Sequence, residues 1–72
     1  MEFEREVFEQ LSSAKERRES ITVKRSPNLQ SARPRTLRGR INLLRKDIIV
    51  VGQGSARPTE ILELSIGGVR VI

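Results

Sequence analysis

The sequence lacks cysteine, histidine, tryptophan and tyrosine, and its only aromatic side chains are two phenylalanines among 72 residues. Without cysteine, disulfides and thiolate metal sites are excluded. Since histidine is missing too, a structural zinc ion has no plausible ligands. Catalytic triads that pair a serine or cysteine nucleophile with histidine are excluded for the same reason. The composition therefore predicts a protein that uses no metal and no cofactor.

Other catalytic arrangements are also difficult to build from this sequence. Asp47 is the only aspartate. Glu60 and Glu63 are three residues apart in an expected strand, so their side chains should point to opposite faces. A single lysine or glutamate can act as a base, but no pattern singles one out. We therefore predict a binding protein and not an enzyme.

Long apolar segments are missing as well. The longest strictly aliphatic run is Ile48–Val51, four residues in all, whereas a membrane-spanning helix needs about 20 apolar residues. Residues 1–6 are acidic and lack the basic start and apolar centre of a signal peptide. These features predict a cytoplasmic protein with no membrane partner.

The positive charge is concentrated in one stretch of the chain. The net charge is +5, yet residues 1–20 carry −2 and residues 47–72 carry −1. Residues 21–46 carry +8 and contain no acidic residue. Six of these eight cations are arginines, whose planar guanidinium group can donate two parallel hydrogen bonds to one phosphate. The cations of the stretch are Lys24, Arg25, Arg33, Arg35, Arg38, Arg40, Arg45 and Lys46.

The first part of the chain has the pattern of an amphipathic helix over residues 2–18. Apolar residues recur at helical spacing, acidic residues crowd its start and basic residues crowd its end, which complements the helix dipole. Residues 13–16 match a capping box, which leaves a break there as an alternative; we favour one continuous helix. The apolar face consists of Phe3, Val7, Phe8, Leu11 and Ala14.

The rest of the chain predicts about five short strands separated by turns. Gly39 interrupts the second of them, and such a glycine is typical of a sharp bend at the corner of a small barrel. The third expected strand contains a run of β-branched residues, which predicts that both faces of that strand are buried. We expect loops at residues 25–35 and 52–58 and a turn at residues 67–68. The expected strands cover residues 21–23, 37–44, 47–52, 59–66 and 69–72.

This order predicts a mainly β fold with an N-terminal helix. Short strands with turns every eight to twelve residues favour a small barrel over an open sheet. We predict one domain over residues 1–72: helix 2–18, then a small β-barrel over 21–72 with a basic loop at 25–35. A chain this short builds a thin core, so we also expect a homo-oligomer or an obligate partner.

The layout resembles a known group of proteins. The helix is followed by a strand, then by Leu37-Arg38-Gly39-Arg40-Ile41, a β-branched strand and an ending of Glu-Leu-Ser-Ile-Gly-Gly-Val-Arg-Val-Ile. This pattern resembles the SH3-like and Sm-like small barrels, including the YolD-like proteins of bacteria and their phages. The resemblance implies RNA binding in a ring, as in Sm-like proteins, or a small partner-binding module, as in YolD-like proteins.

The basic stretch is the main candidate site, and we predict that it binds nucleic acid. In a strand, Arg38 and Arg40 would lie on one face about 7 Å apart. Bases are usually stacked on aromatic side chains, but Phe3 and Phe8 lie on the apolar helix face. We therefore expect backbone-dominated contacts to RNA or DNA, with little sequence preference and a steep dependence on salt.

Three other interpretations of the basic stretch stay open. It fits a protein-interaction or regulatory module that docks on an acidic partner, or a structural subunit of an oligomeric assembly. It also fits a solvated polar face, because charge clusters alone are weakly specific.

Gly52-Gln53-Gly54 does not make a dinucleotide site, since Arg57 stands at the third glycine position and no helix follows.

Overall fold

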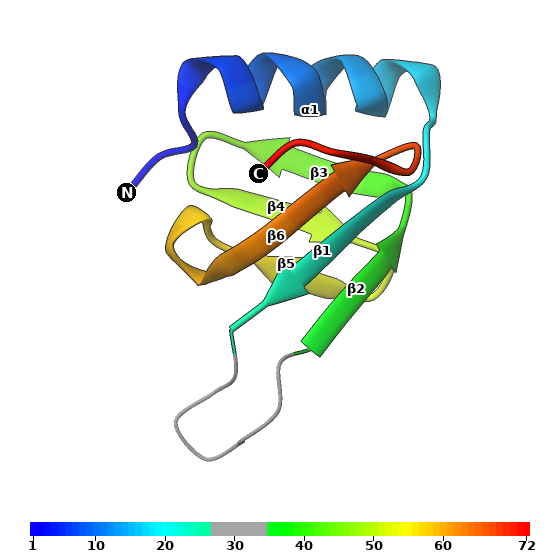
Figure 1. Cartoon of the computed structure of the whole chain (residues 1–72). Coiled ribbons are helices and arrows are strands. Elements are labelled where there is room, and N and C mark those ends of the chain that lie inside the picture. Colours follow the sequence, from blue (N-terminus) through cyan, green and yellow to red (C-terminus); the bar gives the residue numbers. More distant parts are fainter. Residues whose placement is uncertain (27–34) are drawn as a thin grey trace.

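The computed structural model describes residues 1–26 and 35–72 (Figure 1). The candidate Arg33 and most of the predicted basic loop therefore lie outside the described residues. The described part contains one α-helix, a short 3-10 helix and seven strands. They are α1 Arg5–Arg17, β1 Ile21–Arg25, β2 Arg35–Gly39, β3 Ile41–Arg45, β4 Ile48–Val51, β5 Gly54–Ala56, the 3-10 helix Pro58–Glu60, β6 Ile61–Ile66 and β7 Val69–Arg70.

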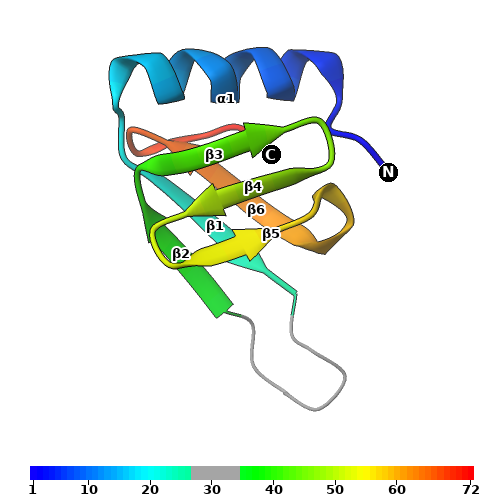
Figure 2. The same ribbon diagram turned by 180° about the vertical axis from the view of Figure 1, so that it is seen from behind.

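The strands form two antiparallel sheets. One has the order β2-β1-β6-β7 and the other the order β3-β4-β5. Figure 1 looks onto the four-stranded sheet, Figure 2 looks onto the three-stranded sheet, and α1 lies across one end of both. The prediction of a mainly β fold with an N-terminal helix is confirmed. Pairing among the described strands gives two sheets and no single closed ladder, so closure into a barrel stays a prediction.

The helix is continuous but shorter than the predicted residues 2–18. It begins only at Arg5, because the N–H of Phe3 donates to the carbonyl of Lys46 at 2.7 Å and ties this segment to the β3–β4 turn. It ends at Arg17, and the capping residue Arg18 that follows adopts the left-handed conformation with φ 56°. That conformation is typical of a helix C-terminus. No break occurs at residues 13–16, so the favoured interpretation is confirmed.

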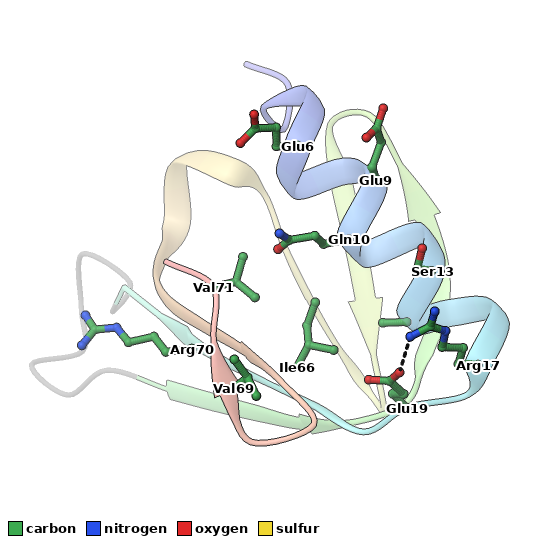
Figure 3. Close-up of a pocket in the computed structure, with 11 residues that line it drawn as sticks. Glu6, Glu9, Gln10, Ser13, Arg17, Glu19, Ile66, Val69, Arg70 and Val71 are labelled. Carbon is green, nitrogen blue, oxygen red and sulfur yellow. Dashed lines mark ion pairs between the residues drawn. The ribbon is translucent and has the colours of Figure 1, made fainter.

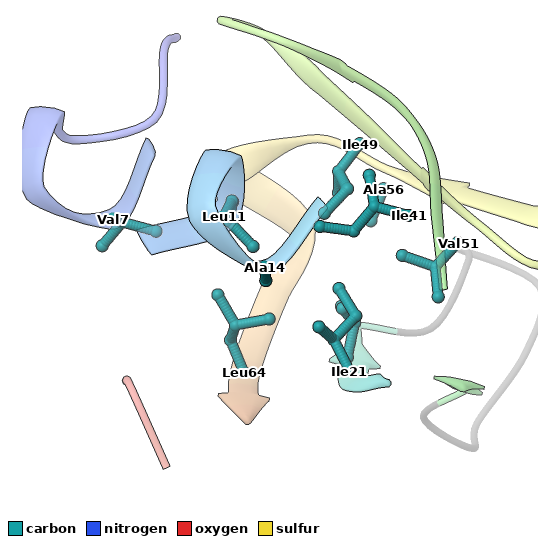
Figure 4. Packing of buried hydrophobic residues seen from close by; sticks show 10 residues of the cluster. Val7, Leu11, Ala14, Ile21, Ile41, Ile49, Val51, Ala56 and Leu64 are labelled. Carbon is teal, nitrogen blue, oxygen red and sulfur yellow. The ribbon is translucent and has the colours of Figure 1, made fainter. Parts of the chain in front are cut away.

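The hydrophobic core lies between α1 and the two sheets (Figure 4). The helix contributes one face, and each sheet contributes the alternate residues of its inner face. Phe3 packs against this core only partly buried, and Phe8 is half-buried outside it. The buried residues of the core are therefore all aliphatic. It consists of Val7, Leu11, Ala14, Ile21, Val23, Ile41, Ile49, Val51, Ala56 and Leu64.

A bend at Gly39 and Arg40 divides the strand predicted over residues 37–44. β2 ends at Gly39, whose φ is +143°, and β3 begins at Ile41 in the other sheet. The N–H of Gly52 donates to the carbonyl of Arg40 at 3.3 Å and holds the bend. The predicted bend is confirmed. The expectation that Arg38 and Arg40 share one face of one strand is wrong, because Arg40 follows the end of β2.

The predicted loop over residues 52–58 contains a strand that the sequence pattern did not show. Gly54–Ala56 forms β5 and pairs with β4, and Ala56 is buried. Leu37 of the other sheet packs so closely on Gly54 that a Cβ there would collide with the leucine side chain. A glycine, a serine and an alanine carry no strand pattern, so this strand depends on its neighbours.

The remaining boundaries follow the predicted order with small shifts. β1 extends to Arg25 instead of residue 23, and β6 begins at Ile61 because Pro58–Glu60 forms the 3-10 turn. Gly67 and Gly68 form the predicted turn, with φ of +57° and +83°. Positive φ at both central residues is the geometry of a tight hairpin.

Replacing Gly39 by alanine tests the bend. An L-residue at this positive φ is strained, so we expect Gly39→Ala to lower the free energy of unfolding by about 1–3 kcal/mol. Urea unfolding followed by circular dichroism measures the loss. Arg40→Ala is the matched control, with an expected change below about 0.5 kcal/mol. Equal stability of Gly39→Ala and the native protein would contradict the need for glycine here.

Candidate phosphate-binding surface

The fold distributes the predicted basic stretch over separate places. Lys24 and Arg25 lie on β1, Arg35 and Arg38 lie on β2, and Arg40 lies at the bend. Arg45 and Lys46 lie at the far end of β3, about 16 Å from Arg40 along the strand. The described cations of the stretch are therefore divided between the four-stranded sheet, the bend at Arg40 and the turn between β3 and β4.

Arg25 has an intramolecular partner. Its Nε and Nη2 donate to one carboxylate oxygen of Glu60 at 3.2 and 2.8 Å. The other oxygen of Glu60 accepts the backbone N–H of Arg57 at 2.8 Å. The hydrogen bonds from Arg25, followed by that from Arg57, hold the pKa of Glu60 below its ordinary value of 4.5. Arg25 therefore serves the fold through this pair, which we did not predict because 35 residues separate the partners.

A register shift explains how Arg25 reaches Glu60. β1 and β6 pair regularly up to Lys24 and Glu63, and the register then shifts so that Arg25 faces Ile61. Such a bulge re-aims the side chains beside it. Arg25 is also the register partner of Arg35 on β2. The carboxylate of Glu60 therefore offsets repulsion between two arginines that face each other across the sheet.

One side of the four-stranded sheet is turned away from the three-stranded sheet and faces the viewer in Figure 1. Since Ile21, Val23 and Leu64 are buried, the residues between them along each strand point outward. Strand register places Arg38, Thr22, Ser65 and Arg70 in one row across all four strands. A second row holds Thr36, Lys24 and Glu63. We call these seven residues the outer sheet face.

The outer sheet face carries excess positive charge. Its three cations are Lys24, Arg38 and Arg70, and its one acid is Glu63. Arg70 and Glu63 form an ion pair at 3.6 Å, but their side chains are 70% and 47% exposed, so the pair is weak. Arg38 is exposed. The face contains hydroxyl groups and no aromatic ring, so it suits phosphates and not stacked bases.

A second basic cluster lies where the helix ends beside the bend. Lys15, Arg18, Arg40, Ile41 and Asn42 line a hollow of about 330 Å³, which we call the corner pocket. Lys15 and Arg18 were not among the predicted site residues, because we interpreted them only as complements of the helix dipole. No pattern along the chain places α1 next to residue 40, so only the fold reveals this cluster.

A groove of different character lies between α1 and β7 (Figure 3). Its volume is about 660 Å³. Ile66, Val69 and Val71 supply apolar surface, and Val69 is 69% exposed. The helix side is polar, and Arg17 forms an ion pair with Glu19 at 3.6 Å. This groove has no excess of cations, and its apolar residues suit a protein segment better than phosphate.

A metal-ligating cluster and a membrane-spanning helix are both missing from the described part of the chain. In residues 1–26 and 35–72, no group of three or more carboxylates or other metal-ligating side chains converges. No helix in that part of the chain is long and apolar enough to cross a membrane.

No protein-family model, curated protein or solved structure matches this chain.

The Arg25–Glu60 pair predicts a pH-dependent contribution to stability. We expect Glu60→Gln to lower the free energy of unfolding by about 1 kcal/mol at neutral pH. Because the folded-state pKa of Glu60 lies below 4.5, the contribution is present above that pH and is lost as pH falls through the folded-state value. The difference between variant and native protein, measured by chemical unfolding, should therefore shrink below pH 4.5 and vanish once the pH lies below the folded-state pKa of Glu60.

The exposed pair between Arg5 and Glu9 is the control for this experiment. These side chains are 91% and 67% exposed, so Glu9→Gln should change stability by less than about 0.5 kcal/mol at every pH. An equal effect of the two substitutions would show that the Arg25–Glu60 pair has no special role.

Proposed function

We propose that this protein is a non-catalytic nucleic-acid-binding protein that contacts the phosphate backbone through the outer sheet face. The observation that supports this most is the cross-strand row of Arg38, Thr22, Ser65 and Arg70. Neighbouring strands lie about 4.8 Å apart, so the row spans about 14 Å. An arginine stands at each end of it, with hydroxyl groups between.

We also propose that the fold is a small barrel of the SH3-like or Sm-like kind. The support is the segment from β2 to β3, which bends at Gly39 and belongs to both sheets. Such a shared, bent strand is how a small barrel turns its corner. In this arrangement the four-stranded sheet forms one wall, and the polar outer side of that wall is the binding surface.

The expected mode of binding follows from the three cations of the face. Arginine grips phosphate with two parallel N–H groups, while lysine acts as a point charge. If these three cations neutralise three phosphates, a plot of log affinity against log salt concentration should have a slope of about −2 to −3. Without aromatic platforms, discrimination between sequences should be small.

A second candidate function is docking of a protein partner or of another copy of this chain. The observation that favours it is the groove between α1 and β7, where Val69 is 69% exposed. Exposed apolar surface of this kind is common at protein interaction sites. Light scattering of the purified protein tests self-association: a single monomer mass at all concentrations would contradict the copy-to-copy form of this candidate.

Anisotropy titrations against labelled single-stranded RNA and duplex DNA test the proposed function. We expect binding at low salt that weakens steeply at physiological salt. Arg38→Ala and Arg70→Ala should each weaken binding and reduce the salt slope by about one. Changing a distant arginine as the control then distinguishes the loss of a specific contact from the loss of net charge.

Arg5→Ala is that control, because Arg5 is 91% exposed on α1 and pairs only with its helical neighbour Glu9 among the described ion pairs. It removes the same charge and should leave affinity nearly unchanged at physiological salt, where fields are screened over about 8 Å. No binding at low salt, or equal losses for Arg5→Ala and Arg38→Ala, would overturn the proposal.

A further inference from the structure

The corner pocket gathers three cations from two distant parts of the chain. Lys15 and Arg18 come from the end of α1, and Arg40 comes from the β2–β3 bend. Both ribbon views place these two elements on the same side of the molecule (Figures 1 and 2). No acidic residue lines the pocket. None of its three cations takes part in the ion pairs found in the described part of the chain.

The charge of this pocket exceeds what the helix end requires. The C-terminus of a helix offers about half a negative charge. Its carbonyls at Ala14 and Lys15 already accept the N–H groups of Glu19 and Arg18 at 3.0 and 3.2 Å. Three positive side chains around one hollow therefore repel one another, and an anion that enters the hollow relieves this repulsion.

The backbone around the pocket is held in place without a ligand. Arg18 adopts the left-handed conformation that ends α1. Arg40 is fixed by the bend, where its carbonyl accepts the N–H of Gly52. The side-chain amide of Asn42 donates to the carbonyl of Gly52 at 2.6 Å. Because these parts are already ordered, binding an anion costs less than it would in a flexible loop.

We infer that the corner pocket binds a terminal phosphate monoester of a nucleic-acid strand. A monoester carries about −1.5 to −2 charges at neutral pH and three acceptor oxygens, which matches three cationic donors. An internal phosphodiester carries a single charge and matches them less well. This inference rests on the proposed function, in which Arg38, two residues before Arg40, contacts the backbone of the same nucleic-acid strand.

The experiment compares oligonucleotides of one sequence that differ only at their ends. They carry a 5′-phosphate, a 3′-phosphate, no terminal phosphate, or a terminal phosphate capped as its methyl diester. We expect one of the two monoesters to bind about tenfold more tightly than the unphosphorylated strand, as charge-assisted hydrogen bonds imply. The methyl diester at the same end should lose most of this preference, because it keeps the shape but loses one charge.

Substitutions then assign the preference to the pocket. Lys15→Gln and Arg40→Gln should abolish it and leave the affinity for the unphosphorylated strand within about twofold. Arg38→Ala should weaken all the oligonucleotides alike. Arg5→Gln removes the same charge elsewhere on α1 and should preserve the preference. Unchanged thermal unfolding of each variant excludes a folding defect as the cause of a loss.

The outcomes separate this inference from the proposed function. Equal affinity for phosphorylated and unphosphorylated strands, with salt-sensitive binding intact, would overturn the pocket and leave the outer sheet face standing. If no oligonucleotide binds, the proposed function fails. In that case a ¹H–¹⁵N spectrum with added inorganic phosphate still decides on the pocket's affinity for phosphate. Shifts confined to Arg18, Arg40, Ile41 and Asn42 would support a phosphate site, and an unchanged spectrum would overturn it.

Discussion

The bend at Gly39 and Arg40 is the constraint on which the rest of the structure depends. A positive φ at Gly39 lets one segment leave the first sheet as β2 and enter the second as β3. The two sheets then enclose a core with no aromatic side chain in it, closed at one end by α1. The same bend separates Arg38 on the outer sheet face from Arg40 in the corner pocket. One backbone feature thus shapes the core and divides the positive charge.

Strand pairing, and not order in the sequence, determines which charged residues of this protein lie next to one another. β6 brings Glu60 to Arg25 and Glu63 opposite Lys24, although residues 21–46 contain no acid of their own. Arg70 arrives at the outer sheet face from the end of the chain. The surface best suited to phosphate is therefore built from residues that are far apart in sequence, and its shape follows from antiparallel register.

The sequence predicted the local features of the fold better than the site. Residues close together in the sequence were enough to predict the helix, the turn at Gly67 and Gly68, and the bend at Gly39. β5 was missed because Gly54–Ala56 has no pattern of its own and is ordered by β4 and Leu37. The arrangement of the candidate site could be predicted only in part, because which cations meet acids and which meet other cations depends on contacts across the sheets.

The most direct test of the central claim is a ¹H–¹⁵N spectrum recorded while a single-stranded oligonucleotide is added at low salt. We expect the shifts to concentrate on the outer sheet face, at Thr22, Lys24, Arg38, Ser65 and Arg70, with further shifts at the corner pocket only when the strand carries the preferred terminal phosphate. Shifts confined to the groove between α1 and β7, at Gln10, Ser13 and Val71, would contradict it. So would a spectrum that does not change.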